Sequence, residues 1–126
     1  MLAADAYARS LGVTHVADDP LTFALTVGER HLNFLGVTHG AVVYGIADVA
    51  HSVASNRAGL RSVMIDSHLT VSAGTGVGDT LTAVVDPISE GRRIATYRIV
   101  VTRGDGRIVG NFTGTVLREG NDTTKA

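Results

Sequence analysis

The chain has 126 residues, of which 44% are hydrophobic and 18% charged, with a formal net charge of −1 and no cysteine. A domain of this length buries enough apolar surface for a core, and the lack of cysteine excludes a disulfide framework and thiolate chemistry. The near-zero charge and the scattered basic residues argue against nucleic-acid binding. We therefore expect a single domain over residues 1–126, with a frayed polar tail at 119–126.

The most apolar stretch is too short for a membrane span. Asp48, His51 and Ser52 interrupt it before the roughly 18 apolar residues that a span needs. The N-terminus also lacks the basic start and apolar core of a signal peptide. The sequence thus predicts a cytoplasmic protein that contacts no membrane.

The N-terminal third predicts a short helix followed by strands and a loop. The helix is expected at Leu2–Leu11, with Gly12 just past its end. Strand patterns fill residues 13–27, with a turn at Asp18–Pro20. Residues 28–38 show no periodicity and predict a loop.

A long buried helix is expected from His39 to about Ala58. Two series of apolar residues follow helical spacing there, so most of the circumference is apolar. Thr38 is expected to cap its start, and Gly59 to end it. The two series are Val42, Ile46, Val49, Val53 and Val43, Ala47, Ala50, Ala54.

The rest of the chain predicts four strands, at residues 62–71, 80–88, 94–102 and 108–117. The Asp105-Gly106 pair is a hairpin signal, and we expect the four strands to pair as an antiparallel meander. The fold class is therefore α+β, with the sheet wrapped around the long helix. One sheet face then lacks a cover, and a second subunit is expected to supply it.

Asp48 is a single carboxylate in the apolar helix. Helical spacing places it on a stripe with Tyr44, His51, Ser52 and Ser55. Such a stripe can simply face solvent, with an ordinary exposed aspartate. It can also face a cleft, where partial burial would tune the carboxylate as a base or nucleophile.

The start of the helix favours the second interpretation. The amides of Gly40 and Ala41 lie in the first turn, at the positive end of the helix dipole. Such donors can hold a developing oxyanion. Asp48 follows Gly40 by eight residues, about 12 Å along the axis, which is too far to act on the same carbonyl. An active site would therefore take its carboxylate from a second subunit.

The segment "HLNFLGVTHGAVVYGIAD", residues 31–48, resembles hotdog-fold acyl-CoA thioesterases of the phenylacetate-degradation (PaaI-like) group, which are related to the 4-hydroxybenzoyl-CoA thioesterases. The resemblance extends over most of the chain, through "SNRAG" and "GRRIATYRIVV". It implies a hotdog fold, with a long central helix inside an antiparallel sheet. It also implies thioester hydrolysis by a homodimer or homotetramer.

The resemblance assigns roles by position. Asp48 would be the nucleophile or the general base toward water, and the Gly40 amide would polarise the thioester carbonyl. Asn33 would help to place substrate or water. Ser52 would orient water or the carboxylate, and His39 would position the backbone rather than transfer protons.

Two departures from the family pattern concern substrate contacts. Ala41 stands where the family usually has a second glycine, but its amide is kept. The family's Arg-Pro after the first long strand is absent, since this chain has "SHLTVSAGTG" there. Arg92 and Arg93 could bind the CoA phosphates, as the matching basic pair does in the family, or could simply be solvated.

The substrate implied is an acyl-CoA carrying an aryl-acetyl or medium-chain acyl group, without a metal or redox cofactor. One alternative is a hotdog dehydratase or hydratase that recruits His39. Another is a non-catalytic module that binds and senses acyl-CoA, which would have no need for the Asp48 carboxylate.

Overall fold

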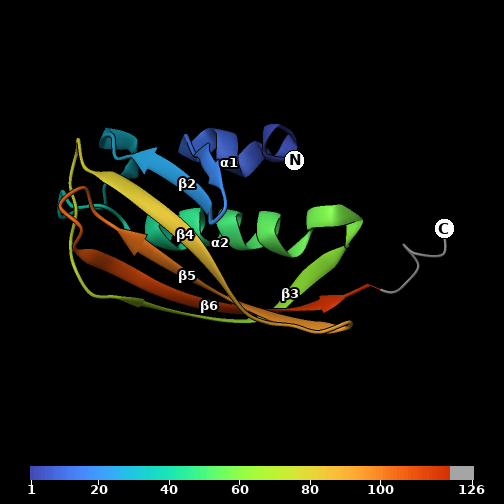
Figure 1. Ribbon diagram of the computed structural model, residues 1–126. Coiled ribbons are helices and arrows are strands. Elements are labelled where there is room, and N and C mark those ends of the chain that lie inside the picture. Colours follow the sequence, from blue (N-terminus) through green and yellow to red (C-terminus); the bar gives the residue numbers. More distant parts are fainter. Residues whose placement is uncertain (120–126) are drawn as a thin grey trace.

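The computed structural model describes residues 1–119, and the expected tail lies outside them except for Glu119. Two α-helices and six strands follow one another along the chain (Figure 1). Helix α1 spans Ala6–Leu11 and helix α2 spans Gly40–Ser55. The strands are β1 (Thr14–Asp18), β2 (Leu21–Thr26), β3 (Ser62–Val71), β4 (Thr80–Glu90), β5 (Ile94–Thr102) and β6 (Ile108–Arg118).

The six strands form one antiparallel sheet in the order β1-β2-β4-β5-β6-β3. The predicted meander is therefore wrong for the first long strand, because β3 pairs with β6 and not with β4. The residues between β3 and β4 instead cross the ends of β5 and β6. As a result β3 is an edge strand, with one side of its backbone unpaired within the chain.

Helix α2 lies in the concave side of the sheet, as the sequence predicts (Figure 1). Its apolar residues pack against the inward positions of β2, β4, β5 and β6. Helix α1 covers part of its other side. Gly45 allows this contact, since a Cβ there would lie 2.8 Å from Leu11 Cδ1 and 3.0 Å from the Tyr7 hydroxyl. The core thus depends on one buried helix and on one small residue within it.

Both helices are shorter than predicted. Asp5 interrupts the first, since its side chain caps α1 by accepting a hydrogen bond from the Ala8 amide at 2.9 Å. A 3₁₀ turn, Leu2–Ala4, precedes it. Helix α2 ends at Ser55, and the predicted continuation toward Gly59 is a separate 3₁₀ turn. Gly12 ends α1 in the left-handed conformation, as expected.

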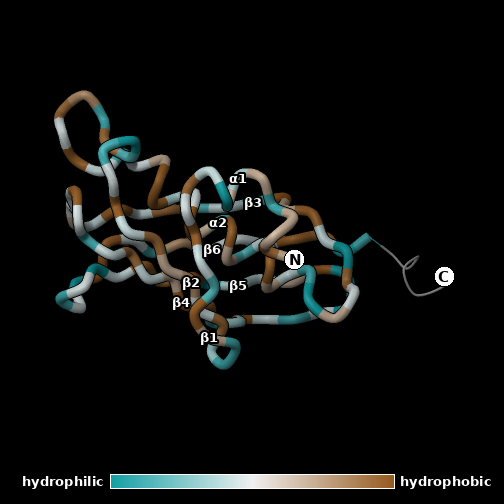
Figure 2. The backbone as a smooth tube through the Cα atoms, turned by 90° about the horizontal axis from the view of Figure 1, so that it is seen from above, coloured by the Kyte–Doolittle hydropathy of each residue, from teal (hydrophilic) through white to brown (hydrophobic). Residues whose placement is uncertain are grey.

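The cover that the sequence analysis expected from a second subunit on the outer face of the sheet stays a prediction. Strand β5 alternates as predicted, with its inward residues buried and its outward residues at least partly exposed. The outward residues of β5 and β6 are mostly polar, so water can solvate this face. Several exposed apolar side chains lie on β3 and on the loop before α2, and Figure 2 colours much of this loop as hydrophobic. The outward residues are Ile94, Thr96, Arg98, Val100, Thr102, Ile108, Asn111, Thr113, Thr115 and Leu117.

The glycine-rich connection from β3 to β4 is tied to its neighbours. Ser72 donates its amide to the Val109 carbonyl at 2.7 Å, and the Thr38 amide donates to the Thr75 carbonyl at 3.0 Å. Gly76 donates to the Asp79 carboxylate at 2.8 Å. This connection therefore forms a fixed wall beside the start of α2. Among residues 1–119, no helix is long and apolar enough to cross a membrane.

Candidate active site

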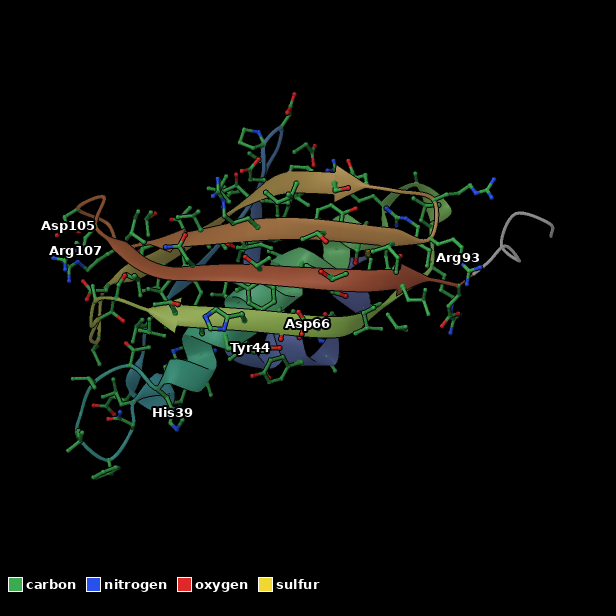
Figure 3. All side chains as sticks on the ribbon, turned by 90° about the horizontal axis from the view of Figure 1, so that it is seen from below. His39, Tyr44, Asp66, Arg93, Asp105 and Arg107 are labelled. Atoms are coloured by element: carbon green, nitrogen blue, oxygen red, sulfur yellow. The ribbon has the colours of Figure 1, made fainter. Side chains whose placement is uncertain are left out.

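Helix α2 presents one partly exposed stripe, formed by Tyr44, Asp48 and Ser52 at intervals of four residues. The Tyr44 hydroxyl lies 2.9 Å from the Ser67 hydroxyl on β3. The stripe therefore lies on the β3 side of the helix, toward the free edge of the sheet (Figure 3). His51 and Ser55, which the sequence analysis placed on the same stripe, are buried instead.

The Asp48 carboxyl is half-buried and has no hydrogen-bond or ion-pair partner in residues 1–119. Burial raises the pKa of this carboxyl above its usual 3.8; a nearby His51 opposes the rise and Asp5 adds to it. A carboxylate with a raised pKa and no competing donor is suited to act as a base or nucleophile. These properties agree with the role predicted for Asp48.

Gly40 is the first residue of α2, and its amide donates to no acceptor within the described part of the chain. The cap is His39 and not Thr38, because the His39 Nδ1 accepts from the Ala41 amide at 3.0 Å. The Thr38 hydroxyl instead accepts from Thr75 at 2.6 Å. Of the two candidate donors, the Ala41 amide is thus already paired, and the Gly40 amide is free.

A cavity of about 420 Å³ opens beside the Gly40 amide. Three of its walls are apolar side chains from the preceding loop, the helix and β3, and a fourth is the β3–β4 connection. Apart from its chain neighbours and the adjacent backbone of α2, no atom lies within 4 Å of the position of a Gly40 Cβ, so a ligand can approach the backbone closely. The lining residues are Val37, Thr38, Gly40, Val43 and residues 71–75.

The two other residues predicted near Gly40 both organise the loop. The Asn33 side-chain oxygen accepts from the Leu35 amide at 2.9 Å and from the Val37 amide at 3.3 Å. His39 donates its amide to the His31 carbonyl at 2.8 Å, in addition to capping α2. Nδ1 of His39 is an acceptor in this cap, and the positioning role that the sequence analysis preferred stays a prediction.

Arg92 and Arg93 do not lie near Gly40 in the same chain. They occupy the β4–β5 hairpin beside the C-terminal end of α2, and Figure 3 places His39 and Arg93 at opposite ends of the molecule. The 16 residues of α2 separate these ends by about 24 Å. The pair can therefore approach a Gly40 cavity only if the cavity belongs to a second copy.

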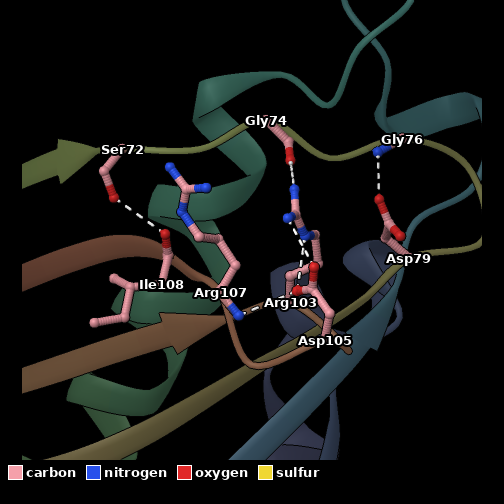
Figure 4. A network of polar contacts seen from close by, with 8 residues as sticks. All are labelled: Ser72, Gly74, Gly76, Asp79, Arg103, Asp105, Arg107 and Ile108. Carbon is pink, nitrogen blue, oxygen red and sulfur yellow. Dashed lines mark hydrogen bonds and ion pairs between the residues drawn. The ribbon is translucent and has the colours of Figure 1, made fainter.

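Two arginines at the Gly40 end were missed. Arg103 donates to the Gly74 carbonyl at 3.0 Å, on the cavity wall, and pairs with Asp105 at 2.8 Å (Figure 4). The Arg107 guanidinium has no ion pair in residues 1–119 and extends toward Ser72 (Figure 4). The sequence signal was present in "RGDGR", which was interpreted only as a hairpin turn.

His51 is the residue that the sequence analysis misplaced, since it is buried and does not share the partly exposed stripe. It is 1% exposed, and its Nε2 is the one buried side-chain nitrogen or oxygen without a hydrogen-bond partner in the described residues. Its ring packs edge-on against Tyr97 and Phe112, with centroids 5.7 and 5.5 Å apart. Burial lowers the pKa of His51, which keeps the imidazole neutral near pH 7.

Known proteins share both the sequence and the fold. A sequence model of the thioesterase superfamily matches residues 35–109. A Deinococcus radiodurans protein named "Putative esterase" is 39% identical over 115 residues, which cover 89% of this chain and 78% of that protein. The acyl-coenzyme A thioesterase PaaI of Escherichia coli K12 is 29% identical over 122 residues, covering 95% and 87%.

Solved structures agree. The E. coli PaaI protein superposes with a TM-score of 0.88 at 27% identity, covering 94% of this chain and 88% of that chain. A mutant of the phenylacetic acid degradation protein PaaI from Thermus thermophilus gives 0.84 at 33% identity, covering 91% and 100%. The predicted hotdog fold and the predicted resemblance to the PaaI group are confirmed.

Proposed function

Because the chain belongs to the thioesterase superfamily, we propose that it is a thioester hydrolase that converts an acyl-CoA to a free acid and CoA. The observation that carries the proposal is the unpaired Gly40 amide at an apolar cavity. The name of the E. coli relative, an acyl-coenzyme A thioesterase, supports CoA as the thiol.

In the proposed mechanism the thioester carbonyl oxygen accepts a hydrogen bond from the Gly40 amide. The positive end of the α2 dipole adds to the stabilisation of charge that develops on this oxygen. The partner's Asp48 then takes a proton from water as the water oxygen attacks the carbonyl carbon. When the C–S bond breaks, that proton passes to the CoA sulfur. Alternatively, the carboxylate attacks the carbonyl carbon first and expels CoA as the thiolate. Water then hydrolyses the resulting mixed anhydride to the free acid and the Asp48 carboxylate, and a proton from that water passes to the thiolate. Neither route requires a metal or redox cofactor.

A two-fold dimer satisfies the spacing of the two groups. If Gly40 faces the partner's Asp48, the axis passes midway between positions 40 and 48 of the helix, at Tyr44. The Tyr44 hydroxyl contacts Ser67, so the same axis crosses β3 near Ser67. There the free edge of β3 can pair antiparallel with its own copy. One dimer thus satisfies both the proposed shared site and the unpaired edge of β3.

The proposed acyl pocket is the cavity at Gly40, and its 420 Å³ suits a medium-chain or aryl-acetyl group. The same dimer turns Arg92 and Arg93 of the partner subunit toward this end of the molecule. The CoA phosphates therefore have two alternative contacts. One is the pair Arg92 and Arg93 of the partner subunit, and the other is Arg107 of the same chain. Arg107→Gln should raise KM for acyl-CoA if Arg107 is the contact, and an Arg92→Gln/Arg93→Gln variant should do so if the pair is.

Gly40→Pro tests the oxyanion donor directly. Proline is favoured at the first helical position and lacks the amide hydrogen, and His39 already has the extended backbone that a residue before proline needs. We expect thiol release from acyl-CoA to fall by about 10²–10³-fold. Gly40→Ala keeps the amide and is expected to lose far less. Equal rates in the two variants would refute the donor role.

Mixing two inactive variants tests the shared site. In a heterodimer of Asp48→Asn and Gly40→Pro chains, one site combines an intact Gly40 with an intact Asp48. Random exchange should restore about a quarter of the wild-type activity. No recovery after exchange would place both groups in one chain. A wild type that binds acyl-CoA without releasing thiol would support the non-catalytic module instead.

A further inference from the structure

Phe34 and Leu35 are the two most exposed large apolar side chains in residues 1–119, at 94% and 70%. They lie at the tip of the loop formed by residues 32–38, called the arm below. Single exposed apolar residues are common, but two adjacent ones at a protruding tip indicate a contact surface. The arm is uncharged, which also suits an apolar partner surface.

The arm is not a slack loop. The Asn33 amide donates to the Val37 carbonyl at 2.8 Å, the Gly36 amide donates to the Asn33 carbonyl at 3.0 Å, and Leu32 bridges to Thr38. The Asn33 side chain accepts from two further amides of the arm. Gly36 has a φ of +82°, a conformation that glycine adopts without strain. The aromatic tip is therefore held in place while it is exposed, which reduces the entropy lost when it packs.

The arm projects past the free edge of the sheet. Figures 2 and 3 both show it beyond β3, on the side where a second copy would add its own strand. With the axis near Ser67, antiparallel pairing sets Val71 opposite the partner's Val63. The arm lies at the Val71 end, since its Val37 lines one cavity with Val71. The surface that it meets is thus the start of the partner's β3.

That surface is apolar and exposed. Met64 pairs with the inward Val116 and so lies on the helix side of the sheet, and Ile65 follows it at a β-bulge. Both are exposed in the single chain. We propose that Phe34 and Leu35 of each copy pack on the Met64 and Ile65 surface of a second copy, so that the two arms hold the dimer together. The proposal rests on the proposed function, in which two chains share one active site, and it adds a contact that holds these two chains together.

The contact has a consequence for the cavity. Val37 and Thr38, at the base of the arm, line the cavity next to Gly40. When the tip of the arm packs on the partner, the position of this wall is fixed by the second chain. The partner then shapes the acyl pocket of its neighbour as well as supplying the Asp48 carboxylate.

Cysteine pairs test the contact, because the chain has no cysteine of its own. A Phe34→Cys/Met64→Cys variant should form covalent dimers under mild oxidation, seen on a non-reducing gel. The matched control is Phe34→Cys/Val16→Cys, since Val16 is exposed on β1 at the opposite edge of the sheet. We expect at least tenfold faster cross-linking in the first pair. Equal rates would overturn the contact.

A charge at the tip of the arm gives a second measurement. Phe34→Asp should raise the dimer dissociation constant at least tenfold in sedimentation velocity, whereas Val16→Asp should leave it unchanged. Equal dimer dissociation constants for the two variants would overturn the contact.

If the cross-link forms while wild type releases no thiol, the arm contact stands and the proposed function fails. If thiol release requires Gly40 but cross-linking stays at the control rate, the function stands and the arm contact fails.

Discussion

The imidazole of His51 lies directly against the backbone of Gly114. A Cβ at Gly114 would come within 2.6 Å of His51 Nε2 and 2.8 Å of its Cδ2. The ring cannot move away, because Tyr97 and Phe112 pack on it. The absence of a side chain on β6 is therefore what admits a histidine into the core beneath the helix.

Gly114→Ala is expected to destabilise the fold by about 1–3 kcal/mol, the usual cost of overpacking a core. Urea unfolding measures it, and Gly104→Ala, where nothing lies within 4 Å of the new Cβ, is the control. In a His51→Ala background the cost of Gly114→Ala should shrink, because the opposing ring is gone. If Gly114→Ala costs as much stability in the His51→Ala background as in wild type, the new Cβ clashes with a residue other than His51.

His51 should make the protein sensitive to acid. Its pKa is lowered in the fold, chiefly by burial, so the unfolded chain binds more protons as the pH drops below about 6.5. Its contribution to stability is therefore present above pH 6.5 and is lost as the pH falls toward the lowered pKa. His51→Gln cannot titrate, and its unfolding midpoint should fall less between pH 7 and 5 than that of wild type. Parallel pH curves would contradict this.

The Asp48 carboxyl should set the acid limb of the pH–rate profile. Its pKa is raised by burial and by Asp5, so kcat/KM should begin to fall above the range of an ordinary aspartate. Asp5→Asn keeps the cap of α1 but removes the charge, and should move this limb to lower pH. An acid limb that Asp5→Asn leaves unchanged would show that another group controls it.

Asp48→Asn should be inactive yet more stable near pH 7, because it removes a half-buried charge.

Arg118 joins four elements at the end of the fold far from Gly40. It donates to the Ser55 carbonyl at 3.0 Å, the Gly91 carbonyl at 3.2 Å and the Tyr97 hydroxyl at 3.2 Å. Arg118→Met would remove these three hydrogen bonds from a charged donor, and we expect a loss of about 2–3 kcal/mol. The control is Arg61→Met, whose side chain is largely exposed. Differential scanning calorimetry of the two variants would decide, and similar Tm values would contradict the prediction.

The sequence predicted what depends on local periodicity. The apolar helical spacing around Ile46 and the alternation of Ala95, Tyr97 and Ile99 identified the helix and a strand that the structure contains. The pairing of β3 with β6 could not be predicted in this way. It joins residues about 50 positions apart, and the turn chemistry between β3 and β4 does not reveal which strand lies beside either.

In the candidate site, too, some features could be predicted from local sequence and others depend on how the chain packs. Asp48 and Gly40 follow from their places on one helix, and the structure gives both the environment that their predicted roles need. The cap was assigned to Thr38 because threonine is a common cap, whereas a histidine cap is not a usual signal. His51 was placed on the polar stripe because it is three residues from Asp48. The packing of α2 on the sheet turns His51 toward Phe112 and away from solvent, and helical spacing alone does not reveal this.

The wall formed by the β3–β4 connection is held mainly through its backbone. Ser72 and Thr75 are fixed by main-chain hydrogen bonds, and Gly74 by the bond that its carbonyl accepts from Arg103. Gly74 also has open space around its missing side chain. The fold therefore places little demand on side chains at positions 73 and 74, although both line the cavity that we propose for the acyl group. In evolution or in the laboratory, substitutions there can change substrate preference at small cost in stability.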